Sequence, residues 1–221
     1  MCGRYTLAIS GEQAQQQFAL PTTPTLAPRY NIAPTQSVAV VRAAEQRRDL
    51  ALLRWGLIPG WAKDAAIGAR MINARGETVA EKPAFKHAMR RRRCLIPADG
   101  FYEWQATAEG KQPIYFQMAD GTPFAFAGLW EQWRGPDGPV ESCTIITTSA
   151  NELVHPVHDR MPVIVAPDDY VRWLAPELDD AAAVADLIKP FPADRMQSYM
   201  VSKAVNQVRN NGPELIAPAG V

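Results

Sequence analysis

The sequence predicts a β-rich fold in which mainly antiparallel strands form a meander that closes into a distorted barrel or folds into two packed sheets. Five short apolar segments between residues 94 and 148 alternate with Asp-Gly, Glu-Gly and Pro-Asp-Gly turn signals. Helical patterns are short and lie outside this region. No internal repeat, low-complexity segment or change of composition divides the chain, so we expect one domain over residues 1–221.

The first element is a short polar helix. Ser10 followed three residues later by Gln13 is a capping-box pattern, and the helix is expected to run to about Leu20. Proline fixes the backbone φ and lacks an N–H, so the next stretch cannot continue the helix. It contains Pro21, Pro24 and Pro28.

A hairpin is expected next. Residues 29–34 are interpreted as an ordered turn that leads into a strand over residues 37–42, and polar residues 43–49 connect it to a second strand over residues 50–55. Glycine and proline then interrupt the pattern, which places Trp61 on a loop where its ring stays partly exposed.

A polar segment and a helix follow the hairpin. Residues 71–78 crowd polar groups around Gly76, which marks either a site or the cap of the next helix. That helix is predicted over residues 81–93 and ends in four consecutive arginines, Arg90 to Arg93. Four successive residues point in every direction around a helix turn, so they cannot all face one core. Interaction with the helix C-terminus explains some of them, and we favour a contribution to phosphate binding.

The five central strands are expected at residues 94–97, 101–105, 113–118, 124–130 and 140–148. Cys94 and Cys143 lie in apolar strands and are interpreted as small buried hydrophobic residues. Side chains alternate along a strand, so Glu103 shares a face with Phe101 and lies among apolar side chains. A partly buried glutamate has a raised pKa and can exchange protons near neutral pH, although an internal salt bridge is the ordinary alternative.

Histidines follow the last central strand. Residues 149–152 carry a second capping signature, and the short helix it predicts must end at Pro156. His155 and His158 have a spacing found in metal sites, but the proline disrupts that geometry and no cysteine or acidic cluster completes a zinc set. We expect no metal and no cofactor, and we interpret His158 as a proton carrier.

The remaining chain is expected to hold helices near residues 168–174 and 180–187 and a strand near residues 198–201. A polar segment around residues 203–211 follows them.

Composition narrows the class of protein. A hydrophobic share of 47% with 21% charged residues is that of a globular protein, and zero net charge argues against a uniformly basic nucleic-acid coat while leaving local patches open. Three cysteines are too few for a disulfide framework. No apolar run reaches membrane-spanning length and no signal-peptide pattern begins the chain. We expect a cytoplasmic, nucleoid-associated protein in a bacterium or a nuclear one in a eukaryote, with no membrane partner.

The N-terminus carries unusual chemistry. Cysteine is small enough for an aminopeptidase to remove Met1, which leaves Cys2 with a free α-amine beside its thiol. These two nucleophiles have unperturbed pKa values of about 8 and about 8.5. Such an aminothiol traps aldehydes, because the amine forms an imine and the thiolate closes on the same carbon to give a thiazolidine. The alternative is a chance residue at a frayed terminus.

Seven motifs in order along nearly the whole chain resemble those of the SOS-response-associated peptidase (SRAP) family. They are residues 1–5, 29–34, 55–61, 72–78, 98–104, 158–162 and 201–206. The resemblance implies a single α+β domain, with a β-rich core flanked by short helices, that detects abasic sites in single-stranded DNA and links itself covalently to them.

The resemblance also implies roles for individual residues. The catalytic residues are Cys2, Asn73, Glu103 and His158. The DNA-binding residues are Arg4, Arg75, Arg160, Trp61 and Trp104. We expect a monomer whose partner is abasic single-stranded DNA. Two other functions stay open. One is a peptidase that uses Cys2 as an N-terminal nucleophile, with its own Met1 as a sufficient substrate, and the other is a non-covalent single-strand-binding module.

Overall fold

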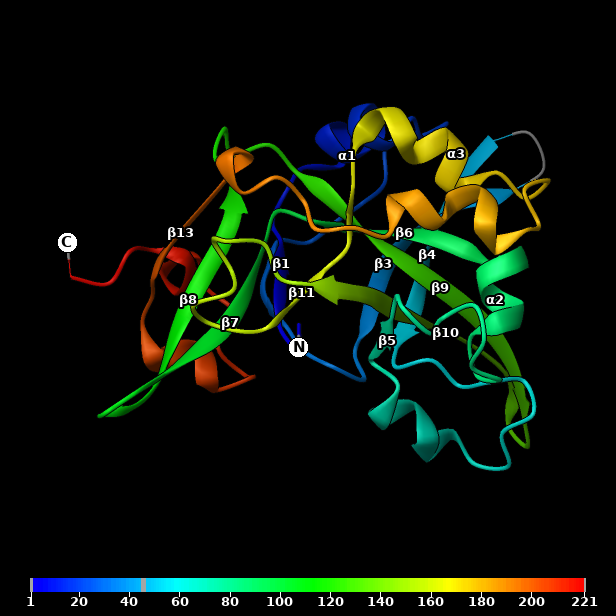
Figure 1. The fold of residues 1–221 in the computed structure, drawn as a ribbon, viewed down its shortest axis with the longest axis horizontal. Helices are drawn as coiled ribbons and strands as arrows, with labels where there is room; N and C mark the ends of the chain where they lie inside the picture. The colour runs from blue at the N-terminus through cyan, green and yellow to red at the C-terminus, as the bar shows by residue number, and fades with distance from the viewer. Residues whose placement is uncertain (1, 45–46, 221) are drawn as a thin grey trace.

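The computed structural model describes residues 2–44 and 47–220, and two β structures organise them. A five-stranded sheet lies on the left of Figure 1 and a barrel lies on the right, and the N-terminal strand β1 (Tyr5–Leu7) belongs to the sheet and lies near the middle of this view. Short helices flank this β core. The predicted α+β class with mainly antiparallel strands is therefore confirmed, and both predicted arrangements occur in it, a barrel and a sheet packed against it.

The five-stranded sheet has the order β13-β8-β7-β1-β2, and all of its neighbours are antiparallel. The strands that join β1 are β2 (Arg29–Ile32), β7 (Gly100–Thr107), β8 (Gly110–Met118) and β13 (Met196–Met200). Tyr5 of β1 pairs with Ile32 on one side and with Phe101 on the other. The N-terminal strand is therefore fixed from both sides.

The barrel closes because one strand pairs with both ends of the series. Its strands are β3 (Ser37–Ala44), β4 (Arg47–Trp55), β6 (Arg93–Ala98), β9 (Phe124–Gly135) and β10 (Gly138–Ser149). Successive pairs in the order β4-β3-β6-β9-β10 are antiparallel, and β10 then pairs in parallel with β4. The ring leaves no open edge between these strands.

Three short strands extend the barrel beside β10 and β9. β5 (Asn73–Arg75) runs parallel to β10, β11 (Arg160–Pro162) runs antiparallel to it, and β12 (Ile164–Val165) pairs with β9. The two segments that the sequence marked as polar sites, around residues 73–78 and 158–160, therefore flank the same strand.

Both faces of the five-stranded sheet are covered. Phe101 belongs to the main core, which is continuous with the barrel, whereas Tyr102 belongs to a second cluster with Tyr115, Val205 and Leu215. The C-terminal segment supplies the outer half of that second cluster. Because β7 alternates between the two cores, Glu103 follows Phe101 onto the barrel side.

The helices are short, and the capping box predicted at the first one is confirmed. Ser10 Oγ accepts from the Gln13 N–H, and Gln13 Oε1 accepts from the Ser10 N–H. α1 is Gly11–Phe18, α2 is Lys86–Arg91 and α3 is Tyr170–Leu174. Single 3-10 segments are Ala65–Arg70, Pro167–Asp169, Ala181–Leu187, Ala193–Arg195, Lys203–Asn206 and Pro213–Ile216. No helix of the described residues is long and apolar enough to cross a membrane.

The hairpin and the five central strands are confirmed, most of them longer than predicted. The interpretation of residues 29–34 as a turn is wrong, because β2 occupies 29–32 and pairs with β1. Strands β3 and β4 extend into the predicted connection of residues 43–49, and residues 45–46 lie outside the described residues.

Three predicted helices are wrong in extent or type. Residues 76–85 form turns, and Arg93 begins strand β6, so only α2 remains of the predicted helix over 81–93. Residues 152–157 form hydrogen-bonded turns, because Asn151 Oδ1 accepts from the N–H groups of Leu153 and Val154. The predicted helix over 180–187 is a 3-10 segment. Tertiary pairing overrides helix propensity in the first case.

The four consecutive arginines, Arg90 to Arg93, form hydrogen bonds and ion pairs within the protein. Arg93 is buried and donates to the carbonyl oxygens of Trp173, Ala175, Met89 and Arg90. The remaining three also have protein partners: Arg90 bonds to the Asp179 carbonyl, Arg91 to the Asp179 carboxylate and Arg92 to Glu131. The phosphate-binding interpretation is therefore wrong for Arg93, which phosphate cannot reach, and stays a prediction for the others.

We predict that Arg93→Met lowers the free energy of unfolding in urea by about 3 kcal/mol, because it removes a buried guanidinium that donates to four backbone carbonyl oxygens, three of them in buried contacts. Arg91→Met is the matched control. Its side chain is exposed and its ion pair lies at the surface, so the change should stay below about 1 kcal/mol. Equal changes in the free energy of unfolding for Arg93→Met and Arg91→Met would contradict the structural role given to Arg93.

Candidate active site

Cys2 lies beside Glu103 because the N-terminal chain continues the β1–β7 pairing. The Tyr102 N–H donates to the Arg4 carbonyl at 3.0 Å, which carries the chain antiparallel to β7 beyond Tyr5. Cys2 is fully buried. Burial raises the pKa of its thiol well above the usual value, and the negative charge of Glu103 raises that pKa further. The thiol therefore needs a nearby base before it can act as a thiolate.

Asn73 holds the Cys2 backbone. Its Nδ2 donates to the Cys2 carbonyl oxygen at 2.9 Å from the first position of β5, where Asn73 pairs with Ile145 of β10. The Asn73 Oδ1 is buried and has no hydrogen-bond partner among the described residues. A buried acceptor without a donor lowers the stability of the fold unless a ligand or a neighbouring amine donates a hydrogen bond to it. The structure thus brings Asn73 and Cys2 together.

Glu103 is a buried carboxylate, as strand alternation predicted. It is 3% exposed, and burial is the first cause of its raised pKa. A carboxylate with a raised pKa takes up a proton more readily than an ordinary glutamate. Glu103 can therefore exchange a proton with the groups beside it, among them Cys2.

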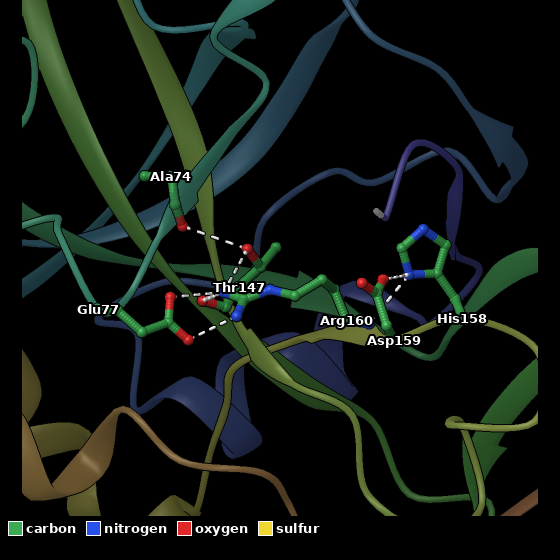
Figure 2. A network of polar contacts seen from close by, with 6 residues as sticks. All are labelled: Ala74, Glu77, Thr147, His158, Asp159 and Arg160. Atoms are coloured by element: carbon green, nitrogen blue, oxygen red, sulfur yellow. Dashed lines mark hydrogen bonds and ion pairs between the residues drawn. The ribbon is translucent and has the colours of Figure 1, made fainter.

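His158 lies on the turn before β11, with two contacts at the same ring nitrogen (Figure 2). The Arg160 backbone N–H donates to Nδ1 at 2.9 Å, and Asp159 Oδ1 lies 2.8 Å from Nδ1. The first contact requires an unprotonated Nδ1 and the second a protonated one. Burial lowers the pKa of His158, so the neutral ring that accepts from Arg160 is the resting state. The Asp159 carboxylate is then placed to stabilise the ring when it gains a proton.

Two polar hollows meet at His158. The first has a volume of about 510 Å³ and is lined by Arg4, Glu103, Trp104, Lys111, His158 and Asn206. The second has a volume of about 610 Å³ and is lined by Arg75, Glu77, Thr78, His158, Asp159 and Arg160. Glu103 and His158 therefore face the same space, and among the described residues His158 alone borders both hollows.

The predicted DNA-binding residues divide between these hollows, with one exception. Arg4 and Trp104 line the first, and Arg75 and Arg160 line the second. Trp61 lines neither and is 61% exposed on its loop, as predicted.

Two of these arginines have protein partners. Arg4 donates to Asn31 Oδ1 at 2.6 Å and to the Val205 carbonyl at 2.8 Å. Arg160 forms a two-point ion pair with Glu77. A phosphate that binds either guanidinium must share it or compete for it.

Sequence reasoning missed several residues of the hollows. Glu77 and Thr78 stand in the polar segment already marked as a site, and Asn206 stands in the last family-like motif, so a signal for each was present. Lys111 follows a turn on β8 and carried no signal, because only the pairing of β7 with β8 brings it to this face. Among the described residues, no group of three His, Cys, Asp or Glu side chains could hold a metal ion.

Comparisons with known proteins identify the family of this chain. Residues 1–208 match the model of the family described as SOS response associated peptidase (SRAP). Abasic site processing protein YoqW of Bacillus subtilis is 44% identical, over 98% of this chain and 99% of its own. Abasic site processing protein YedK of Escherichia coli is 31% identical, over 99% of this chain and 100% of its own. HMCES of Gallus gallus, with the same description, is 33% identical over 86% of this chain and 66% of its own.

Solved structures show the same fold. A Bacteroides thetaiotaomicron protein superposes with a TM-score of 0.89 at 24% identity, over 99% of this chain and 100% of its own. A Bordetella bronchiseptica protein superposes with a TM-score of 0.81 at 30% identity, over 91% of this chain and 100% of its own.

We predict that Glu103→Gln raises the melting temperature at pH 8 and that this gain shrinks as the pH falls. The pKa of Glu103 is raised in the folded state, so the folded protein binds the proton more tightly than the unfolded chain. The carboxylate therefore costs stability above its folded pKa, and that cost disappears once it is protonated. Melting curves between pH 4.5 and pH 8 test this, with the exposed Glu109→Gln as control. A difference in melting temperature between Glu103→Gln and the wild type that does not change with pH would contradict this prediction.

Proposed function

Because the chain belongs to the SOS response associated peptidase family, we propose that it processes abasic sites in single-stranded DNA by linking Cys2 covalently to the ring-opened sugar. The observation that carries the proposal is that Asn73 holds Cys2 beside the buried Glu103, next to a hollow that Glu103 shares with His158. Relatives over nearly the whole chain are named abasic site processing proteins, which supports the substrate class.

The linkage requires two nucleophiles on one residue and a base beside them. After loss of Met1, the Cys2 amine attacks the aldehyde carbon, and loss of one water gives an imine. The sulfur then bonds to the same carbon, the thiol proton passes to the imine nitrogen, and a thiazolidine results. Glu103 accepts and returns the protons at the amine and the carbinolamine. Since its proton uptake also removes the negative charge that raises the thiol pKa, each transfer to Glu103 makes the thiol easier to ionise.

Opening of the sugar must precede this step, because an abasic deoxyribose exists largely as a closed hemiacetal. The neutral His158 ring takes the proton of the anomeric hydroxyl and delivers a proton to the ring oxygen as the ring C–O bond breaks, and Asp159 stabilises the imidazole while it is charged. The unpartnered Asn73 Oδ1 accepts from the Cys2 terminus or from a sugar hydroxyl. If thiazolidine closure is slow, the imine allows β-elimination of the 3′ phosphate, which gives a lyase reaction.

Flanking nucleotides are held by charge and by stacking. Arg75 and Arg160 lie in one hollow and Arg4 in the other, so phosphates on both sides of the lesion meet a guanidinium. Trp104 and the exposed Trp61 offer surfaces for unstacked bases. A single strand is favoured because no complementary base must be displaced.

An N-terminal-nucleophile peptidase is the second candidate, and the family description favours it. Removal of Met1 by the chain itself satisfies that description without an external peptide. We rank this function second because relatives over nearly the whole chain are named abasic site processing proteins. A non-covalent single-strand-binding module is the third candidate, and it makes Cys2 dispensable.

Incubation with a single-stranded oligonucleotide that contains one abasic site should give a slower band on a denaturing gel. The band should disappear in Cys2→Ala and in a protein with a tag ahead of Met1, because both lack the free aminothiol. Intact mass measured first confirms that Met1 is absent from the active preparation. No band from protein with a free Cys2 would refute the linkage, and a band that survives in Cys2→Ala would exclude the proposed nucleophile.

Cys2→Ser separates the roles of the amine and the sulfur. The variant keeps the α-amine, so it should still form an imine, but the hydroxyl closes far less readily on the imine carbon than a thiolate does. We expect at least about tenfold less stable crosslink without reductant, and recovery of the band when borohydride reduces the imine. A stable crosslink at the wild-type level in Cys2→Ser would show that the sulfur takes no part.

A further inference from the structure

We propose that Glu77 is a positioning residue: it holds Arg160 so that the turn of His158 keeps its place against the strand of Asn73, and it weakens the binding of DNA in doing so. The inference rests on the proposed function and adds a residue to it. Glu77 lies in the second hollow and does not itself reach the reacting atoms of the mechanism above.

The contacts of Glu77 converge on one guanidinium (Figure 2). Its two carboxylate oxygens accept from Arg160 Nη1 at 2.5 Å and from Nη2 at 2.9 Å. The same Nη2 donates to the Thr147 carbonyl at 2.7 Å. Paired contacts of this kind fix the direction as well as the position of a guanidinium. Arg160 is accordingly 17% exposed at its side chain, whereas Glu77 is 53% exposed.

This guanidinium joins the two segments that carry the site. Thr147 of β10 pairs with Arg75 of β5, and its Oγ1 lies 3.4 Å from the Ala74 carbonyl, one residue after Asn73. On the other side, the Arg160 backbone N–H donates to His158 Nδ1. Glu77 follows β5 and therefore ties the end of that strand to β11. Loss of the tie frees the His158 turn relative to Asn73.

The same carboxylate opposes DNA binding. Hydrogen bonding to Arg160 lowers the pKa of Glu77, so the group is ionised at neutral pH. It lines a hollow with Arg75 and Arg160, where a phosphate is expected to bind, and it neutralises one of those two cations. A negative charge within a few ångströms of a phosphate lowers affinity at low salt, and screening weakens that effect at high salt.

These two effects predict opposite changes in binding and chemistry. With protein in excess over an abasic oligonucleotide, Glu77→Ala should lower the maximal crosslinking rate about tenfold, and Glu77→Gln, which keeps one acceptor, about threefold. Non-covalent affinity for a strand with a reduced abasic site, which has no aldehyde, should rise about two- to fivefold at low salt in both variants. Glu81→Gln is the control, because it removes the same charge from the same stretch outside the hollow.

A third measurement does not depend on the reaction. In DNA-free protein, the ring ¹⁵N shifts of His158 should report one tautomer with its proton on Nε2, and Glu77→Ala should mix the two tautomers. Wild-type protein that does not crosslink would refute the proposed function, while the ring shifts and the affinities would still test the role of Glu77. Wild-type rates in both Glu77 variants, reduced DNA affinity, or an unchanged tautomer in Glu77→Ala would each overturn the inference.

Discussion

The pairing of β1 with β7 is the constraint on which the candidate site depends. Tyr5 lies opposite Phe101, and because antiparallel strands run past each other, the residues before Tyr5 must run beside those after Phe101. Cys2 is thereby brought to Glu103 although about 100 residues separate them in the chain. β2 supports β1 from its other side, and Asn31 at the end of β2 donates to three carbonyl groups of the C-terminal segment. Cys2 and the strand that follows it are therefore part of the core, although segments near a chain end are loosely held in most proteins.

Burial then sets the chemistry of the groups that meet there. It raises the pKa of Cys2 and of Glu103, and it lowers the pKa of His158. In each case the neutral form is favoured, which is the expected result of removing a charge from water. A raised carboxylate pKa and a lowered imidazole pKa lie closer together than the ordinary values do, so a proton passes between such groups at a smaller cost in free energy. The same burial makes the site costly to maintain, so stability and reactivity are linked at these positions.

Many arginines are bound to partners within the protein: Arg4 to Asn31, Arg93 to backbone carbonyls, Arg160 to Glu77. Such pairs keep the guanidinium groups oriented and limit their attraction for nucleic acid of any sequence. Arg75 is exposed and shares its hollow with Arg160 and Glu77.

The sequence by itself determined those features that depend on near neighbours. The aminothiol that Cys2 carries once Met1 is removed, the capping box at Ser10, the hairpin of β3 and β4 and the inward direction of Glu103 all follow from local bonding or from strand alternation. Only the tertiary structure decided which distant groups meet. The closure of the barrel by the parallel pairing of β10 with β4, the bond from Asn73 to Cys2, the burial of Arg93 at the start of β6 and the tie between Glu77 and Arg160 each join segments whose separation in the sequence carries no signal. The physical reason is that hydrogen bonding and burial act on distance in space, and only the complete set of strand pairings fixes those distances.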